Sequence, residues 1–328
     1  MVDFLSSNSW SSSSWLLVAV QAALYAVAAP LLSAWIKKVK SHLQNRRGPS
    51  LLQPYRDLRK LFAKEVLMAH TASPLFRAAP YIVFGTTLLA ATVVPLLVVR
   101  LPIETIADVI VLVGFLAMAR FFLALAGMDV GSAFGGMGSS REMLLSALAE
   151  PAMLMAVFTL AMTAHSTNLA SMITTNLDAG LVLRPSYLFA LLGLLLVAVA
   201  ETGRIPIDNP ATHLELTMIH EAMILEYSGR HLALMEWAAQ LKLMLYGVLI
   251  CNVFFPWGMV SQMPLGYPAI AVAVVSLIAK LALLGMVLAI AETVNAKMRL
   301  FRAPQFLNLA LLLALLGLFS NVILETGP

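Results

Sequence analysis

The chain contains one cysteine, Cys251, and no CxxC motif. A single cysteine excludes an internal disulfide and a zinc or iron–sulfur site built from several thiolates. Charge is also scarce, because only 12% of the residues are charged, about half the share of an ordinary soluble domain. Hydrophobic residues make up 60% of the chain. This composition indicates an integral membrane protein, and any redox metal must belong to a partner.

The first 14 residues are rich in serine and contain no lysine or arginine. A cleavable signal peptide begins with a basic segment, so we expect the first apolar run to remain as a membrane span. No later stretch has the composition of a separate soluble domain. We therefore expect a Ser-rich segment over residues 1–14 and a single transmembrane helical domain over residues 15–328.

Apolar runs of about 20 residues, long enough to cross the hydrocarbon as a helix, recur along the chain. They predict an all-α integral membrane protein with about eight transmembrane helices. The expected spans are residues 15–36, 78–99, 104–126, 143–165, 185–203, 233–257, 266–291 and 304–324.

Lysine and arginine are distributed unevenly between the two sets of loops. With both termini outside, the inside loops hold sixteen of the 21 basic residues and the outside loops hold two. Because basic residues collect on the cytoplasmic side, this asymmetry predicts that both termini lie on the outer side of the membrane.

The first inside loop contains a short amphipathic pattern. Apolar residues recur at steps of three and four over residues 51–62, and basic residues fill the other positions. This pattern predicts an interfacial helix, either as a plain anchor on the lipid surface or as a contact for a partner. The preceding pair Arg46 and Arg47 would suit lipid head groups or an acidic partner equally.

The second inside loop, residues 126–142, contains five glycines. Their spacing is not that of a phosphate-binding loop, so we expect a flexible loop packed under a partner. Ser139 or Ser140 is expected to cap the next helix and to place Glu142 in its first turn.

Several charged residues fall inside the expected spans. Glu150 lies about two turns into the fourth span, and Lys242 and Lys280 lie in the sixth and seventh. Ionisable groups in hydrocarbon are costly, so each marks either a functional site or a structural ion pair between helices. Asp108 lies near an interface, where a structural role is the better interpretation.

Acids are concentrated after the fifth span, where residues 201–242 hold six of the seventeen in the chain. Asp208 or Asn209 is expected to begin a helix on which Asp208, Glu215 and Glu226 line one face. No matching line of cations is visible in the sequence. Crowded, buried carboxyls exchange protons near neutral pH, so this line predicts a proton relay.

A metal site is the alternative for the same stretch, because it also holds three histidines. The residues around His220 and Glu221 do not form an HExxH motif, and acids along a line do not make a cluster. We therefore expect no metal ion in this chain.

Four segments together resemble a known family over residues 16–325. They are RRGPSLLQPYRDLRKLF, SSREMLLSALAEPAML, ETGRIPIDNPATHLELTMIHEAMILEYSGRHLAL and AQLKLMLYGVLICNVFFPWG. The chain is identified from them as similar to the membrane subunit of membrane-bound nickel-iron hydrogenases, of the formate hydrogenlyase type. That family is related to the H subunit of respiratory complex I.

The resemblance implies a subunit of an oxidoreductase complex that carries no redox centre of its own. It would couple proton translocation to hydrogenase chemistry and join a soluble arm to a membrane arm. The implied partners are the small and large hydrogenase subunits, an iron–sulfur protein and antiporter-like membrane subunits. Iron–sulfur clusters and a nickel-iron centre are expected in those partners, and the location is a prokaryotic cytoplasmic (inner) membrane.

The resemblance also assigns residues to roles. Acidic positions of the family motifs, with the two lysines of the later spans, give an expected proton path. That path is Glu142, Glu150, Glu201, Asp208, Glu215, Glu221, Glu226, Lys242 and Lys280. The arginines expected to dock the soluble arm are Arg46, Arg47, Arg141, Arg204 and Arg230.

Two other functions remain as alternatives. The first is the quinone-chamber subunit of a complex I-type NADH-quinone oxidoreductase. The stretch from Pro210 to Glu226 is about a turn longer than in that type, which favours the hydrogenase. The second is a stand-alone carrier or channel, which is disfavoured because the two halves of the chain show no internal repeat.

Overall fold

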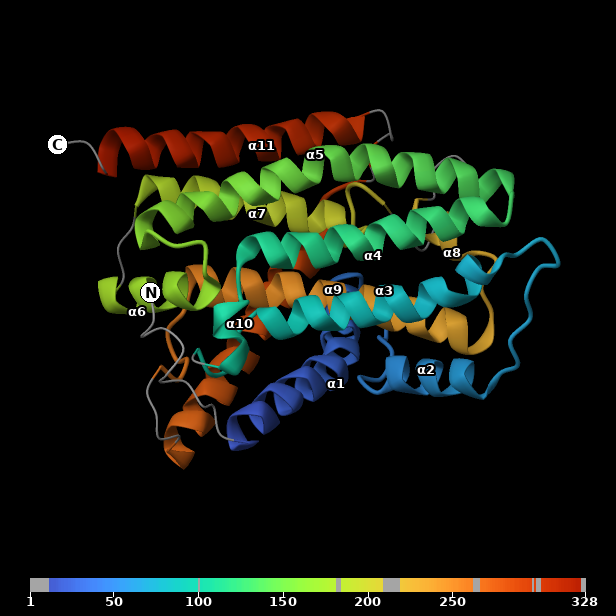
Figure 1. Ribbon diagram of the computed structural model, residues 1–328, viewed down its shortest axis with the longest axis horizontal. Helices are drawn as coiled ribbons and strands as arrows, with labels where there is room; N and C mark the ends of the chain where they lie inside the picture. Colours follow the sequence, from blue (N-terminus) through green and yellow to red (C-terminus); the bar gives the residue numbers. More distant parts are fainter. Residues whose placement is uncertain are drawn as a thin grey trace, which may run out of the picture.

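The computed structural model describes residues 12–99, 101–180, 184–208, 219–261, 266–296, 298 and 302–325. Long helices dominate these residues, and most of them run along one direction (Figure 1). Seven are long and apolar enough to cross a membrane. They are α1 (Ser12–Leu43), α3 (Pro74–Val93), α4 (Val109–Asp129), α5 (Ala133–Ala164), α9 (Gly229–Phe254), α10 (Tyr267–Val294) and α11 (Ala303–Ser320).

An eighth apolar helix, α7 (Pro185–Glu201), occupies the place of the expected fifth span but has only 17 residues. It packs against α5, α9 and α11, so it belongs to the bundle. The protein is a multi-pass α-helical membrane protein. The described residues give seven long spans and this shorter helix rather than eight of full length.

Side-chain caps fix where several of these helices begin. Asp108 precedes α4, accepts a hydrogen bond from the Ile110 amide at 2.8 Å, and accepts another from the Thr167 hydroxyl at 2.5 Å. Ser73 caps α3 in the same way, by accepting a hydrogen bond from the Leu75 amide. The structural role expected for Asp108 is therefore confirmed.

The bundle has a closely packed part and a splayed part. Helices α3, α4, α5, α7, α9 and α11 lie side by side, and α1 and α10 slant across their direction (Figure 1). Helix α1 packs on α3, α9 and α10, whereas α10 packs on α1 and α9. The core between them contains fully buried aromatic and aliphatic side chains such as Tyr25, Leu194 and Tyr246. The start of α1 and the end of α11 lie at the same end of the bundle.

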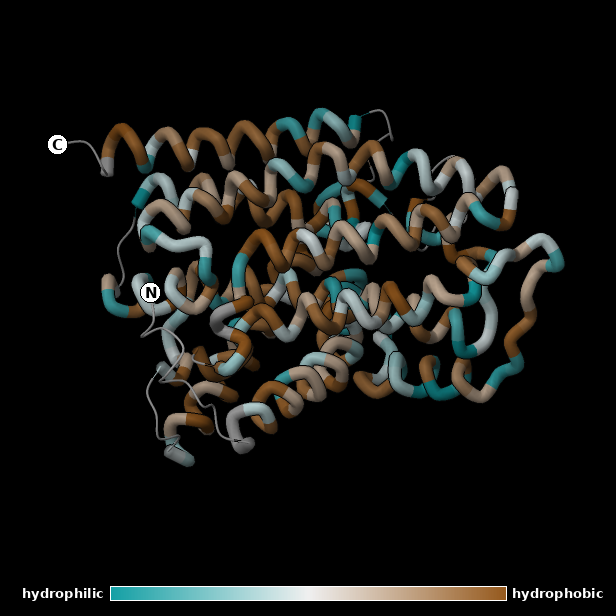
Figure 2. The backbone as a smooth tube through the Cα atoms, viewed as in Figure 1, coloured by the Kyte–Doolittle hydropathy of each residue, from teal (hydrophilic) through white to brown (hydrophobic). Residues whose placement is uncertain are grey.

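The opposite end of the bundle carries short helices and is richer in hydrophilic residues (Figure 2). There α2 (Gln53–Ala63) buries Pro54 and Leu58 against α1 and α9 and exposes its basic side chains, which confirms the amphipathic helix expected in the first loop. The small helix α8 (His220–Ile224) lies at this end too. Helix α6 (Leu169–Ala179) lies at the other end.

The glycine-rich segment is not a flexible loop, and that expectation is wrong. Helix α5 already begins at Ala133, capped by the Ser132 hydroxyl, and not at Ser139 or Ser140. Glu142 therefore lies in its third turn. The glycines serve close packing, because a Cβ on Gly138 would lie 3.0 Å from the Ile219 carbonyl oxygen and 3.0 Å from the Ala222 Cβ.

We predict that Gly138→Val lowers the free energy of unfolding by about 1–3 kcal/mol, because the added methyl groups overlap α8. Gly136→Val is the matched control in the same helix, since nothing lies within 4 Å of a Cβ built there. Thermal unfolding of the purified protein in detergent measures both. Equal melting temperatures for the two variants would contradict the close approach of α5 and α8.

Candidate functional site

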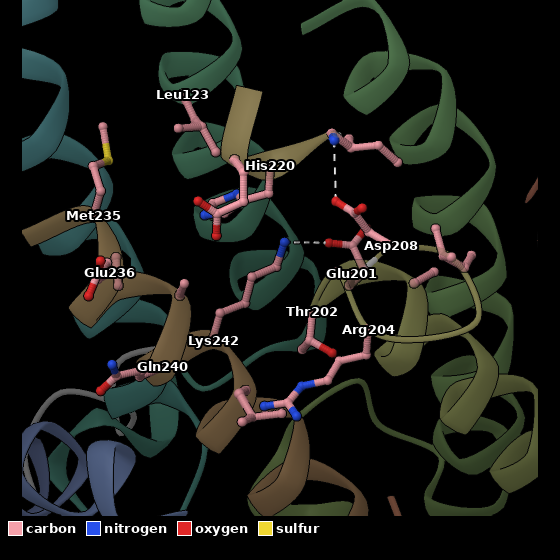
Figure 3. A pocket seen from close by; sticks show the side chains of 18 of the residues that line it. Leu123, Glu201, Thr202, Arg204, Asp208, His220, Met235, Glu236, Gln240 and Lys242 are labelled. Atoms are coloured by element: carbon pink, nitrogen blue, oxygen red, sulfur yellow. Dashed lines mark hydrogen bonds and ion pairs between the residues drawn. The ribbon is translucent and has the colours of Figure 1, made fainter. Parts of the chain in front are cut away.

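A cavity of about 470 Å³ lies between the helices near the end that carries α2 and α8. Residues of α1, α3, α4, α5, α7, α8, α9 and α10 line it, and Figure 3 shows part of its wall. We call it the charged cavity. Its ionisable residues are Lys37, Lys40, Arg120, Glu142, Glu201, Arg204, Asp208, His220, Glu221, Glu236, Lys242 and Glu292.

One buried ionisable group in this wall is the guanidinium of Arg120, on α4. Its Nη1 lies 2.5 Å from Glu201 Oε1, and its Nη2 lies 2.6 Å from Glu150 Oε1. The side chains of Arg120 and Glu201 are only 5% and 4% exposed. Lys242 Nζ lies 2.8 Å from the other oxygen of Glu201 (Figure 3). Together with the two contacts of Arg120, this pair makes a chain of ion pairs from α5 through α4 and α7 to α9.

This chain of ion pairs corrects the expectation that the acids lack cations. Glu201 is held by two cations, and Arg120 is shared by two carboxylates. The interior of a bundle tolerates such charges only as pairs, because removing one member leaves the other uncompensated. Sequence reasoning did not place Arg120 in the site, although an arginine in the middle of an apolar span was the signal for it.

A second ionic cluster joins the ends of two long helices to the turn after α7. Glu292, on α10, lies 2.9 Å from Lys40 Nζ and 2.7 Å from Arg204 Nη1. Arg204 was expected to dock a soluble arm, but its side chain is only 17% exposed and its guanidinium meets Glu292 in the cavity wall. Sequence reasoning assigned no role to Glu292, which lies near the end of an apolar run.

Three acids of the cavity wall have no ion pair with the described residues. They are Glu142 on α5, Glu221 on α8 and Glu236 on α9. Two of these, Glu142 and Glu221, belong to the expected proton path. These three differ from Glu201 and Glu292, whose carboxylates are held by ion pairs.

Asp208 lies deeper in the wall and is 3% exposed. Its Oδ2 accepts a hydrogen bond from the Ile219 amide at 3.2 Å (Figure 3), which holds the two described ends of the central segment together. Glu215 lies outside the described residues. Glu226 does not continue a line of acids, because α8 ends at Ile224 and Glu226 is exposed beyond it. The predicted line is therefore wrong at this position.

His220, the first residue of α8, points into the charged cavity (Figure 3). Its Nε2 is buried and has no hydrogen-bond partner among the described residues. Burial lowers the pKa of His220 below the usual 6.5; Lys242 lowers it further, while Glu221 and Asp208 oppose the shift. The imidazole is therefore held neutral in the folded protein.

The remaining expected site residues are scattered. Lys280 does not line the charged cavity, and its buried Nζ has no hydrogen-bond partner among the described residues. Of the arginines expected to dock a partner, Arg46, Arg47 and Arg230 are exposed, and Arg141 is half-buried. Docking by these arginines stays a prediction.

Within the described residues, no three His, Cys, Asp or Glu side chains gather closely enough to hold a metal ion. The ionisable side chains of the wall carry charges of both signs. Its lining contains both ion-paired groups and carboxyls that have no ion pair with the described residues.

Residues 15–324 match the NADH dehydrogenase family, and the chain belongs to this family of membrane subunits of respiratory complexes. It is 34% identical to formate hydrogenlyase subunit 4 of Escherichia coli K12, over 87% of this chain and 92% of that protein. It is 32% identical to hydrogenase-4 component C of the same organism, over 85% and 87% of the two chains.

More distant similarity extends to other members. NADH-quinone oxidoreductase subunit 8 of Rhodothermus marinus is 26% identical, over 71% of this chain and 72% of its own. A chain of the archaeal membrane-bound sulfane sulfur reductase superposes with a TM-score of 0.76 at 19% identity. That superposition covers 94% of this chain and 99% of that one, and it shows that the fold is shared.

We predict that Arg120→Gln destabilises the protein by about 3–5 kcal/mol, because Glu201 and Glu150 lose their shared cation inside the bundle. The matched control is Arg230→Gln, an exposed arginine whose replacement should stay within about 0.5 kcal/mol. Chemical or thermal unfolding in detergent compares the two. A further variant, Arg120→Gln with Glu201→Gln, should recover part of the loss, and no recovery would argue against the pair.

The neutral state of His220 gives a prediction for pH. Because its pKa is lower in the folded than in the unfolded state, the unfolded state binds more protons below about pH 6.5. Stability should therefore fall as the pH is lowered through this range, and His220→Gln should flatten the fall. Melting temperatures recorded between pH 8 and pH 5 measure this fall in stability. Parallel curves of melting temperature against pH for the native protein and His220→Gln would contradict the role of His220.

Proposed function

We propose that this chain is the membrane subunit that anchors the soluble arm of a membrane-bound nickel-iron hydrogenase complex and couples its chemistry to proton translocation. Both hydrogenase relatives resemble the chain more closely than the quinone-oxidoreductase relative does. The chain itself would carry no redox centre. Iron–sulfur clusters and the nickel-iron centre would belong to the soluble subunits.

The observation that carries the proposal is the charged cavity and the ion-pair chain that leaves it. Arg120 links the cavity to Glu150, whose side chain is 35% exposed on α5 at the level of the spans. A change of charge at the cavity would alter the field at Glu150 through this short chain. Glu150 would face the neighbouring antiporter-like subunit, and the cavity would face the soluble arm.

Different groups of the cavity would have different tasks. Arginine keeps its proton at any physiological pH, so Arg120 would set the field and not carry protons. Glu142, Glu221 and Glu236 would exchange protons because no fixed cation among the described residues holds them. Water entering the cavity from the α2 end would connect them.

Docking would use the same end of the bundle. Arg46 and Arg47 precede the amphipathic helix α2 in the chain, Arg230 is the second residue of α9, and all three are exposed. Basic residues on this end would place it on the cytoplasmic side of a prokaryotic inner membrane, with both termini outside. The small hydrogenase partner would then sit over the mouth of the charged cavity.

We predict that Glu142→Gln leaves the complex assembled but lowers proton movement per hydrogen formed by at least about tenfold, since a positioned proton-transfer group contributes about 10² or more. Inverted membrane vesicles, with hydrogen formation and internal acidification recorded together, give this ratio. Glu226→Gln is the matched control, because Glu226 is exposed outside the cavity.

An unchanged ratio in Glu142→Gln, with normal assembly, would contradict the relay. The wider proposal is tested by the proteins that co-purify with the tagged chain, which should include a nickel-ligating large subunit. Reduction of a quinone analogue with hydrogen as the electron donor, abolished by Glu142→Gln, would instead assign the cavity to quinone chemistry.

A further inference from the structure

A second cavity, of about 420 Å³, lies on the splayed side of the bundle. We call it the apolar groove. Its walls come from α1, α7, α9, α10 and α11, and include Leu196, Leu243, Gly247, Leu284, Leu288 and Leu313. It forms because α10 packs on α1 and α9 but not closely on α7 or α11. Only 17% of the apolar stretch of α10 is buried.

The apolar groove offers no polar atom to a ligand. Only Thr202 and Tyr246 bring polar side chains to its wall. The Thr202 hydroxyl donates to the Ala198 carbonyl at 2.6 Å, and the Tyr246 hydroxyl points to Met153 Sδ at 3.5 Å, on α5. A molecule in this groove is therefore recognised through hydrocarbon alone, and its polar part must lie elsewhere.

The groove opens to the surroundings of the bundle at the level of the spans. Two of its lining residues, Leu192 and Val287, are 41% and 52% exposed. They lie on helices of the transmembrane bundle, so the medium that meets them is the hydrocarbon of the bilayer. Acyl chains are thus the hydrocarbon supplied at this place.

One end of the groove lies near basic side chains of the neighbouring charged cavity and of the start of α11. Thr202 and Ala291 line this end, close in the chain to Arg204 and Glu292. Lys40 and Arg204 both pair with the single carboxylate of Glu292, which leaves a net positive cluster. Arg302 is exposed at the start of α11, and the Met298 amide holds this linker to the Pro206 carbonyl at 2.9 Å.

We propose that the apolar groove binds one acyl chain of an anionic phospholipid, whose head group lies against this positive cluster and Arg302. The groove shares Ile36, Thr202 and Leu243 with the wall of the charged cavity. The bound chain therefore completes the barrier between the charged cavity and the bilayer. The proposal does not depend on the reaction of the complex.

The test uses the purified complex after detergent delipidation. Phosphatidylglycerol with a photoreactive diazirine on one acyl chain is added, and labelled peptides are mapped by mass spectrometry. Labelling should fall on residues 284–291 of α10 and 192–199 of α7. Leu288→Trp fills the groove and should lower the labelling of these residues about tenfold. That factor corresponds to displacing two buried methylene groups of the acyl chain.

Two matched controls carry the same change outside the groove. They are Leu283→Trp on α10 and Leu188→Trp on α7, at leucines that are 65% and 56% exposed. In both variants the groove residues should be labelled as strongly as in the native protein. Leu196→Trp, from the opposite wall, should repeat the loss. Undiminished labelling in both Leu288→Trp and Leu196→Trp overturns the site.

The head-group part is tested with phosphatidylcholine of identical chains. Phosphatidylglycerol should label the groove about fivefold better, and Arg302→Gln should reduce this preference, since one basic residue near the surface contributes about that factor. Equal labelling by both lipids overturns the anionic head group. Displacement of the label by an equal concentration of an isoprenoid quinone overturns the phospholipid and assigns the groove to a quinone tail.

Discussion

The guanidinium of Arg120 is the interaction on which the inner half of this bundle depends. Four helices bring charged side chains to one buried place, and only the shared arginine makes that arrangement tolerable in a low-dielectric interior. The position of Glu201 at the end of α7 follows from it, as does the approach of α9 through Lys242. The charged cavity exists because these helices meet through ion pairs instead of filling the space with apolar side chains.

Close packing elsewhere gives the cavity its shape. Gly127 and Gly138 let α4, α5 and α8 approach within backbone contact, so α8 is pressed against the α4–α5 hairpin and carries His220 into the cavity. On the other side, α1 and α10 stand away from α7 and α11. The same molecule thus combines a tight face and an open one, and the two cavities lie on either side of Ile36, Thr202 and Leu243.

Much of the fold was predictable from sequence, because hydrophobic length and the 3.6-residue period act locally. The apolar runs predicted the long helices, and the amphipathic pattern predicted α2. The bounds were less accurate, because α5 begins ten residues before its expected span and α1 ends seven residues after its own. The site was less predictable. Glu201, Asp208, Glu221 and Lys242 do line one cavity, but Arg120 and Glu292 acquire their importance only from helices far away in the chain. The glycine-rich segment was wrongly predicted as a loop. Its glycines lie in and before helix α5, and those in contact with other helices serve by having no side chain, which lets the helices approach closely.

The hydrogen bond from the Ile219 amide to Asp208 joins two residues that are eleven positions apart in the chain. It ties the turn after α7 to the residue that precedes α8. Arg204 in that turn pairs with Glu292 on α10, and His220 is the first residue of α8. A displacement of α10 can therefore reach the imidazole in the charged cavity through one amide and one carboxylate, without passing through the apolar core.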